Sequence, residues 1–438
     1  MDIKELGIDK NVVTKEYVFS KQEIEIAERR VTNELNQKYT IEGFRRGRVP
    51  KSVFKTRFGK SFYEIFVFEK LIDNIYNSVK GENLLLVPEI AESTVNADEA
   101  KIVVYLHKKP EITIDYEKIK VKVTNKEQVL DNYVEFRLKT FQEENAILEP
   151  KDGEADYEDL VKVKVTILSN DTGKELIKEK EDEYVLYKDD ERPIVTNVVG
   201  HKKGDIVEFD REFDVSEEGK KLSYHYKIEI LEIYNRNLPE ITDEFVKTTL
   251  SEMHLETVEA LKNKLREEGE QIYESETKQS IREQILSLLP DATELDISEK
   301  TIDYAVRLIV ANMKEENSFE NFVKKYNNEE EALKELKEYY LHDLKKELAL
   351  DKIAKENEIK KEVTDEELDS YAEILAPYWG ISVERAKVLV KERADIRKEV
   401  ENTIFVDKIL DVIAEKVEKE VVDVDKDNKE GEENEKEQ

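Results

Sequence analysis

Cysteine is missing from this chain of 438 residues, and glycine (13) and proline (8) are scarce. Without cysteine the protein has no disulfides, no thiol catalysis and no cysteine-ligated zinc. Few glycines and prolines leave few places for turns, so we expect long helices. The chain holds no run of about 18 apolar residues, and its opening Met-Asp-Ile-Lys-Glu-Leu forms no apolar signal core. We therefore expect a soluble, cytoplasmic protein.

Signals for catalysis and metal binding are also weak. The five histidines are scattered, and no two have the i, i+4 spacing of a metal site on a helix. Gly59-Lys60-Ser61 resembles part of a phosphate-binding loop, but Phe54 stands where that loop needs a glycine. Abundant carboxylates pair by chance, which supports no acid–base site. We expect no metal and no cofactor, and we assign no catalytic residue.

Charge, by contrast, is abundant and one-sided. Charged residues make up 40% of the chain, against about 25% in a typical protein, and the formal net charge is -32. A chain of this length is too long for one ordinary core and suggests about three domains. Its acidic balance argues against general binding to nucleic acid.

One segment reverses this balance. Residues 43–60 contain seven cations and no acid: Arg45, Arg46, Arg48, Lys51, Lys55, Arg57 and Lys60. Like charges this close repel one another, and screening over about 8 Å at physiological salt does not remove repulsion between neighbours. A polyanionic partner would supply the missing counter-charge. The segment therefore predicts a docking site.

The order of residues in this segment predicts a loop with a presented tip. Gly43 and Gly47 bracket Phe44-Arg45-Arg46, so the backbone can turn tightly at both ends. Pro50 can begin a helix. Arginine offers a rigid fork for phosphate or carboxylate, and phenylalanine offers an apolar anchor. The alternative is a solvated surface loop with incidental arginines.

The run Gly43-Phe44-Arg45-Arg46-Gly47-Arg48-Val49-Pro50 resembles the ribosome-docking signature of bacterial trigger factors, chaperones of the polypeptide exit tunnel. The similarity extends through Phe58-Gly59-Lys60 and recurs to near residue 420. It implies docking on the large ribosomal subunit, with a ribosomal protein and ribosomal RNA as partners, and a homodimer off the ribosome. The implied ribosome-binding residues are Gly43, Phe44, Arg45, Arg46, Gly47, Arg48 and Pro50.

The expected fold is multidomain α+β. It has an α+β ribosome-docking domain, a β-rich FKBP-like inserted domain and an all-α C-terminal chaperone domain with arms. The boundaries we expect are a ribosome-binding domain (1–110), a linker with the first part of the C-terminal domain (111–149), a degenerate isomerase domain (150–235), a helical substrate-binding domain (236–420) and a disordered acidic tail (421–438).

Local patterns give the elements of the first domain. Ser20 and Glu23 form a capping box, and the helix they begin carries an apolar stripe. Ser61 and Glu64 predict a second such cap. Residues 51–58 predict a short helix ended by Gly59. Strands are expected at residues 11–19, 84–90 and 102–107.

The middle block departs from a working FKBP-type site. Gly200-His201-Lys202-Lys203-Gly204 matches the motif, but the preceding glycines and the Ile-Pro-Gly-Phe-Glu element are replaced by a charged stretch, residues 187–197. We therefore expect the fold to be kept and the peptidyl-prolyl isomerase activity to be weak or absent. Residues to check for a residual pocket are Tyr184, Ile194 and Tyr226.

The C-terminal third is predicted to be helical. Helices are expected at residues 256–289, 299–316, 330–358, 365–376, 382–392 and 394–418, the first stopped by Pro290. Their apolar stripes must mostly pack together, but one left exposed would bind unfolded chains. The stripes are Ile302, Ala305, Leu308 and Ile309; Leu375, Tyr378 and Trp379; and Ile404, Ile409 and Ile413.

The favoured function is an ATP-independent, ribosome-associated chaperone that docks at the exit tunnel and shields nascent polypeptides. Two alternatives stay open: an active peptidyl-prolyl isomerase that assists folding, and an RNA-binding assembly factor that uses residues 43–60.

Overall fold

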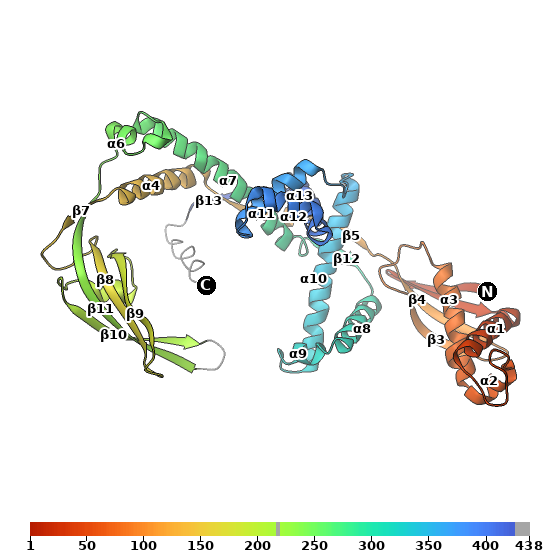
Figure 1. The fold of residues 1–438 in the computed structure, drawn as a ribbon. Helices are drawn as coiled ribbons and strands as arrows, with labels where there is room; N and C mark the ends of the chain where they lie inside the picture. Colours follow the sequence, from red (N-terminus) through yellow and green to blue (C-terminus); the bar gives the residue numbers. More distant parts are fainter. Residues whose placement is uncertain (216–219, 425–438) are drawn as a thin grey trace. The chain divides into compact units, whose positions relative to one another are not determined.

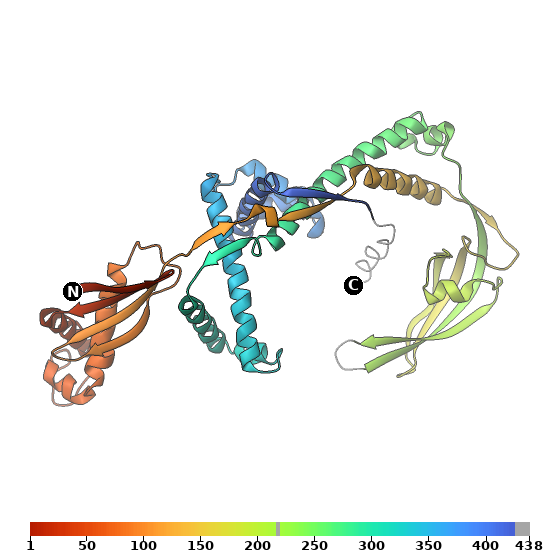
Figure 2. The ribbon, with the colours of Figure 1, turned by 180° about the vertical axis from the view of Figure 1, so that it is seen from behind.

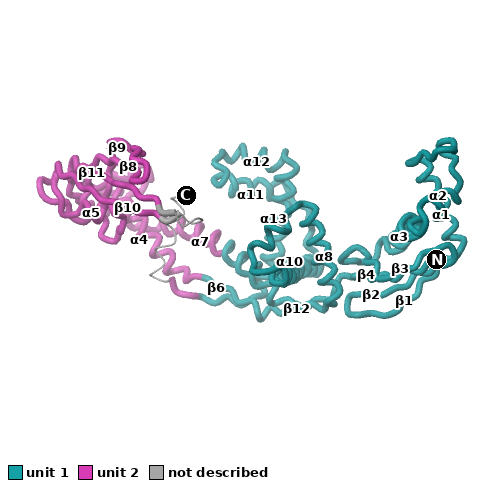
Figure 3. Tube along the Cα trace, turned by 90° about the horizontal axis from the view of Figure 1, so that it is seen from below, with its two compact units in different colours: residues 1–123, 278–421 teal, residues 124–277, 422–438 magenta. Residues whose placement is uncertain are grey.

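The computed structural model describes residues 1–215 and 220–424. Two compact units make up the chain. The first contains residues 1–123 and 278–421, and the second contains residues 124–277 with the segment from residue 422 onward (Figure 3). Within the described ranges, no helix is long and apolar enough to cross a membrane.

The N-terminal part of the first unit is an antiparallel sheet with helices packed on one face (Figures 1 and 2). The strand order is β1-β2-β4-β3, formed by β1 (Asp2–Asp9), β2 (Val12–Phe19), β4 (Ala100–His107) and β3 (Glu89–Val95). The helices are α1 (Lys21–Lys38), α2 (Lys51–Phe58), the π-helix η1 (Phe62–Val67) and α3 (Phe68–Ser78). The α+β prediction for this region is confirmed.

Helix α1 forms as its sequence predicts. Ser20 and Glu23 make the reciprocal capping box, and the apolar stripe of the helix is buried in the core. Helix α2 also begins and ends as expected, except that Pro50 is its N-cap instead of its first residue.

Two expectations for this region were wrong, and one strand was not predicted. The Ser61 side chain caps no helix, because residues 62–67 wind as a π-helix that leads into α3. Of the strand expected at residues 84–90, only the beginning of β3 at Glu89 and an isolated bridge at Leu84 form. Strand β1 was missed, because all eight of its residues are exposed and it has no buried apolar face to reveal it.

The rest of the first unit is mainly helical. It contains α8 (Glu299–Glu315), α9 (Phe319–Val323), α10 (Glu329–Glu356), α11 (Asp365–Tyr378), α12 (Val383–Glu392) and α13 (Ala394–Ala414). The end of α7 (Val258–Leu288) also belongs here. Its main core gathers residues from α7, α10, α13 and the linker, among them Ile119, Val121, Ile285, Ile353, Ile409 and Ile413.

Two short two-stranded ladders lie within this helical region, the first of them antiparallel. Strand β5 (Glu111–Ile114) pairs with β12 (Thr293–Asp296), and β6 (Lys120–Thr124) pairs with β13 (Glu418–Val422). The second ladder extends ordered backbone past residue 421, where the acidic tail was expected to begin. The rest of that tail, from residue 425, lies outside the described residues.

A buried polar network joins the N-terminal sheet to the start of α8. The Asn11 side chain, beside β2, donates to the Lys108 carbonyl (2.8 Å) and accepts from the Ser298 backbone N–H (2.9 Å) and the Thr301 hydroxyl (3.2 Å). His107 Nδ1 lies 3.0 Å from the same hydroxyl, and its ring stacks on Tyr304. We call these residues the polar joint.

The second unit combines a helix pair with a sheet. Helix α4 (Lys126–Glu144) packs with the first half of α7 and with α6 (Asp243–Thr248) around Val134, Phe141, Val246, Leu261 and Leu265. The sheet has the order β10-β11-β8-β9, and β7 also pairs with β11. It is built from β7 (Ile147–Pro150), β8 (Leu160–Ser169), β9 (Glu175–Val185), β10 (Ile206–Val215) and β11 (Lys220–Asn237), with α5 (Pro193–Val198) packed on its core. The β-rich middle region was predicted correctly.

Candidate functional site

The basic loop, residues 42–48, lies between two buried residues that fix its ends. Ile41 precedes it and Val49 ends it, and both side chains lie in the core. Asn36, on α1, holds the second anchor from both sides: its Oδ1 accepts the Val49 N–H (2.8 Å), and its Nδ2 donates to the Val49 carbonyl (3.0 Å). Because Asn36 is itself buried, this pair of hydrogen bonds is shielded from competing water and fixes where the loop ends.

Two tight turns shape the tip. The Phe44 N–H donates to the Ile41 carbonyl (3.1 Å), and the Arg48 N–H donates to the Arg45 carbonyl (3.0 Å). Gly43 and Gly47 have φ values of +89° and +79°, a region in which a Cβ is strained. The glycine pair therefore has the conformational role that the sequence suggested.

The tip presents its side chains to solvent. Phe44 is 39% exposed, and Arg45, Arg46 and Arg48 are exposed as well. Among the described residues, no carboxylate lies within ion-pair distance of these three arginines, nor of Arg57 or Lys60. The predicted residues are thus brought together on one loop, with their positive charge uncompensated.

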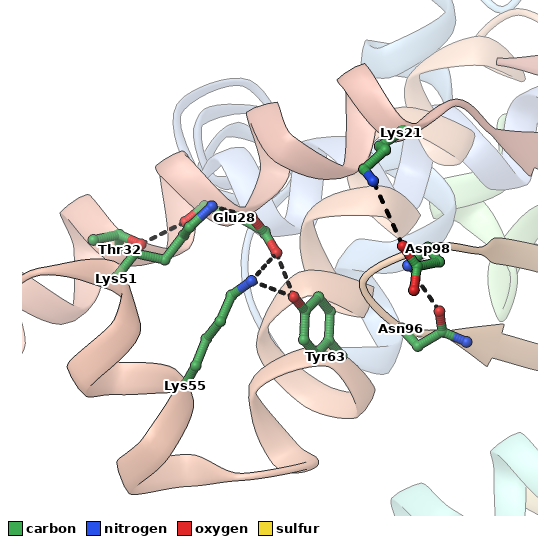
Figure 4. Close-up of polar contacts among 8 residues, drawn as sticks. All are labelled: Lys21, Glu28, Thr32, Lys51, Lys55, Tyr63, Asn96 and Asp98. Atoms are coloured by element: carbon green, nitrogen blue, oxygen red, sulfur yellow. Dashed lines mark hydrogen bonds and ion pairs between the residues drawn. The ribbon is translucent and has the colours of Figure 1, made fainter.

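The other two cations of the segment are compensated by Glu28 of α1 (Figure 4). Its carboxylate accepts from Lys51 Nζ (2.5 Å), Lys55 Nζ (2.6 Å) and the Tyr63 hydroxyl (2.5 Å), and Lys55 also bonds that hydroxyl. The Glu28 side chain is only 4% exposed. We call Glu28, Lys51, Lys55 and Tyr63 the Glu28 cluster.

Protonation equilibria within the cluster follow from these contacts. Burial alone would raise the pKa of Glu28, but hydrogen bonds from Lys51, Lys55 and Tyr63 outweigh it, so the pKa is lowered. Burial would lower the pKa of Lys55, yet Glu28 and Tyr63 raise it. Both groups are therefore held in their charged forms.

Glu28, Asn36 and Tyr63 were not singled out from the sequence. A signal was present for Glu28, because it falls within the apolar stripe of α1, between Ile24 and Val31. A carboxylate on a buried helix face requires partners, and two lysines one helical turn apart lie in the segment that follows.

The middle sheet places the residues proposed for a residual isomerase pocket around its core. Tyr184 and Ile194 pack on the buried cluster, and Tyr226 stacks on Phe209 with ring centroids 5.1 Å apart. In the charged stretch, Arg192 forms an ion pair with Asp190 (2.7 Å). Tyr184 pairs with Val161 of β8 and Tyr226 pairs with Ile167 of the same strand, about 20 Å further along, so the structure does not bring the three residues together in one pocket.

The apolar stripes of the C-terminal helices differ in exposure. Ile302, Ala305, Ile404, Ile409 and Ile413 are buried in helix packing. At the end of α11, Tyr378 is 84% and Ile374 is 58% exposed, and Trp379 follows with 37%. Ile374 and Tyr378 are one turn apart on the same helix face. The exposed apolar surface of α11 is therefore a candidate for binding unfolded chains.

A cleft of about 860 Å³ lies along α8 and the first half of α10. Its apolar lining comes from Val306, Val310, Ala311 and Leu333, and Tyr105 and Glu89 from the N-terminal sheet reach its edge. A lining that mixes apolar and charged side chains suits a polypeptide segment better than a small polar metabolite.

An exposed basic loop in the N-terminal region and exposed apolar surface in the helical region are features of a binding protein of the chaperone class. Comparison with known proteins agrees. The family model for bacterial trigger factor protein (TF) matches residues 1–141, and the model for its C-terminus matches residues 257–415. The chain therefore belongs to the trigger factor family.

Similarity to individual members spans nearly the whole chain. The trigger factor of Thermotoga maritima is 43% identical over 424 residues, which cover 97% of each protein. That of Kosmotoga olearia is 43% identical over 409 residues, covering 93% of this chain and 91% of the relative. A solved structure concerns promiscuous substrate recognition in the folding and assembly activities of the trigger factor chaperone. It is 42% identical to this chain with a TM-score of 0.74, and the match covers 95% of this chain and 100% of that one. This chain is a ribosome-associated chaperone that binds ribosomes and nascent chains, as predicted.

Proposed function

We propose that this chaperone docks on the ribosome through Phe44, Arg45 and Arg46, on a loop shaped by Gly43, Gly47, Arg48 and Pro50. The observation that carries the proposal is the set of exposed, unpaired arginines on a clamped loop, in a chain with a net charge of -32. Guanidinium groups bind phosphate bidentately, and Phe44 supplies an apolar anchor. Ribosomal RNA phosphates and an acidic site on a ribosomal protein are the counter-charges.

The five segments expected from the sequence divide the work. Residues 1–110 dock in the cytoplasm at the tunnel exit, and residues 111–149 link them to the helical domain of residues 236–420. That domain holds emerging apolar segments on the exposed face of α11 and in the cleft beside α8. Binding of this kind uses apolar contact and needs no nucleotide.

We also propose that free molecules form homodimers in which the docking tip of one copy meets an acidic or apolar surface of another. Sedimentation velocity over a range of protein concentrations tests this. The tip variant described below should shift the equilibrium towards monomers, and an unchanged equilibrium would exclude the tip from the dimer.

The middle domain, residues 150–235, is proposed to have weak or no isomerase activity. Its support is the replacement of the motif by the charged stretch that carries the Asp190–Arg192 ion pair. A refolding reaction limited by a prolyl bond, with slow phases of tens of seconds, is the test. Clear acceleration by catalytic amounts of the protein would instead make the isomerase alternative correct.

The docking proposal is tested by ribosome co-sedimentation of the intact chain and of a variant with Phe44→Ala, Arg45→Ala and Arg46→Ala. A matched control, Lys4→Ala with Lys80→Ala, removes two exposed cations of the same domain outside the loop. The control should pellet like the parent, and the tip variant should stay in the supernatant with an unchanged circular dichroism spectrum. Equal binding of all three proteins would refute docking through the tip.

A further inference from the structure

We propose that Glu28 is a positioning residue for docking, which divides the cations of residues 43–60 into two classes with different work. Lys51 and Lys55 hold helix α2 against α1, and Arg45, Arg46, Arg48, Arg57 and Lys60 stay free for the ribosome. This inference rests on the proposed docking through the loop.

The geometry of α2 carries the division. Lys51 and Lys55 are one turn apart and reach the same carboxylate from one face of the helix (Figure 4). Phe54, between them in sequence, is buried in the core, whereas Thr56 and Arg57 are exposed. Helix α2 therefore buries Phe54 in the core, directs its two paired and partly exposed lysines toward Glu28, and leaves Arg57 exposed.

Tyr63 closes the cluster from the next helix. Its hydroxyl donates to Glu28 Oε1 (2.5 Å), and Lys55 Nζ lies 4.8 Å from the centre of its ring. Three elements, α1, α2 and η1, thus meet on one buried carboxylate. A buried carboxylate that lost these partners would be strongly unfavourable, so the folded domain keeps both lysines in place.

The cluster also controls the loop. Lys51 follows Pro50, and Pro50 follows Val49, whose backbone is bonded to Asn36 on both sides. Helix α2 therefore continues the anchored end of the loop without a flexible spacer. If α2 moves, the loop loses one of its two fixed ends, and the ordering of the tip must then be supplied by the binding free energy.

The division has a measurable electrostatic consequence. Each cation that neutralises an RNA phosphate contributes about 0.7–0.9 to the slope of log affinity against log salt. Of the seven cations in residues 43–60 only the five free ones contribute, so this segment adds at most about 4.5 to the magnitude of the parent's slope. Lys51 and Lys55 should add nothing while Glu28 holds them.

Three variants of the full chain test this, by ribosome binding over a range of salt concentrations. Glu28→Gln releases both lysines and loosens α2; it should weaken binding at physiological salt about tenfold and steepen the slope by about 1–2, because two more cations reach RNA. The combined variant Glu28→Gln, Lys51→Gln, Lys55→Gln removes the cluster without leaving an unpaired buried charge. It should weaken binding about tenfold, as Glu28→Gln does, because α2 again loses its contacts with α1, but it should keep the parent's slope, because no lysine is released to reach RNA. Arg45→Gln with Arg46→Gln reports on the loop itself and should reduce both affinity and slope.

The outcomes separate the two proposals. Parent-like ribosome affinity and slope in the Arg45→Gln, Arg46→Gln variant would refute docking through the loop. Suppose instead that this variant loses affinity and slope as expected, but that the slope of the combined variant is smaller than the parent's by about 1–2. Lys51 and Lys55 would then contact the ribosome, and the division into two classes of cation would be wrong. Parent-like affinity and slope in Glu28→Gln would also overturn it. If Glu28→Gln does not fold, the combined variant still decides between these outcomes.

Discussion

Removing the Asn11 side chain should open the polar joint between the N-terminal sheet and α8. Asn11 makes three hydrogen bonds there, to the Lys108 carbonyl, the Ser298 N–H and the Thr301 hydroxyl. In Asn11→Ala the Thr301 hydroxyl keeps its contact with His107 (3.0 Å). The Ser298 N–H, on a residue that is 2% exposed, is left without its acceptor.

The size of the effect follows from these bonds. An orphaned buried donor costs about 1–3 kcal/mol, and each net hydrogen bond lost costs about 1 kcal/mol. Together they predict that the joint loses about 2–4 kcal/mol of opening free energy, or roughly 30- to 700-fold in its opening equilibrium. A multidomain chain does not unfold in one step, so a global melting temperature would not report this.

Amide hydrogen exchange is the suitable assay, because it reads opening locally. Peptides covering the start of α8 should lose protection in Asn11→Ala, and peptides of α11 and α12 should not change. Asn96→Ala is a matched control in the same domain, since Asn96 accepts two backbone N–H bonds in an exposed turn. A change below about threefold at α8 would mean that the network does not hold the joint, and the reasoning about its buried donors would be wrong.

Three further predictions concern individual side chains. Burial lowers the pKa of His107; Glu89 opposes this effect, and Arg307 adds a smaller lowering. The ring is therefore neutral in the native joint, whereas the unfolded chain takes up a proton there below about pH 6.5. The joint should therefore open more readily as the pH drops below that value, and hydrogen exchange at the start of α8 should depend less on pH in His107→Asn than in the parent. Gly43→Ala with Gly47→Ala places a Cβ at two positive-φ sites, at about 1 kcal/mol each, so ribosome binding should weaken while the melting profile of the domain changes little; unaltered binding would show that the turns are dispensable. Tyr378→Asp changes a side chain that is 84% exposed, so stability should shift by less than about 0.5 kcal/mol, but suppression of aggregation of an unfolded client should decline; full suppression would exclude this face from client binding.

Features whose cause is local in sequence could be predicted well. The capping box at Ser20 formed as expected, because it needs only a partner three residues away. The positive φ values of the glycine pair in the loop were also predictable, because they depend only on the missing Cβ of each glycine. Helix ends in the C-terminal region fall within a few residues of their predicted positions, since glycine, proline and cap residues mark them.

Features that depend on distant partners could not be predicted. Strand β1 has no buried residue, and it forms because β2 offers an edge on which to pair. The Asn11 and Ser298 pair joins positions 287 residues apart, and no periodicity in either segment indicates the other. The π-helix at residues 62–67 replaced a predicted cap, because the packing of η1 and α3 decides its winding and the side chain of Ser61 does not.

The sequence separation of these contacts also predicts that docking through the loop does not depend on the polar joint. The hydrogen bonds that fix the loop and the helix after it join residues that are close in the chain: Asn36 and Val49 are 13 apart, and Glu28 and Tyr63 are 35 apart. The joint instead needs α8, whose partners lie 287 and 290 residues from Asn11. The loop therefore takes its shape from its own domain, whether or not α8 is in place. It follows that Asn11→Ala should bind ribosomes like the parent even when its joint exchanges freely. A parallel loss of ribosome affinity would mean that the joint reaches the docking loop through the sheet, and the separation drawn from contact range would fail.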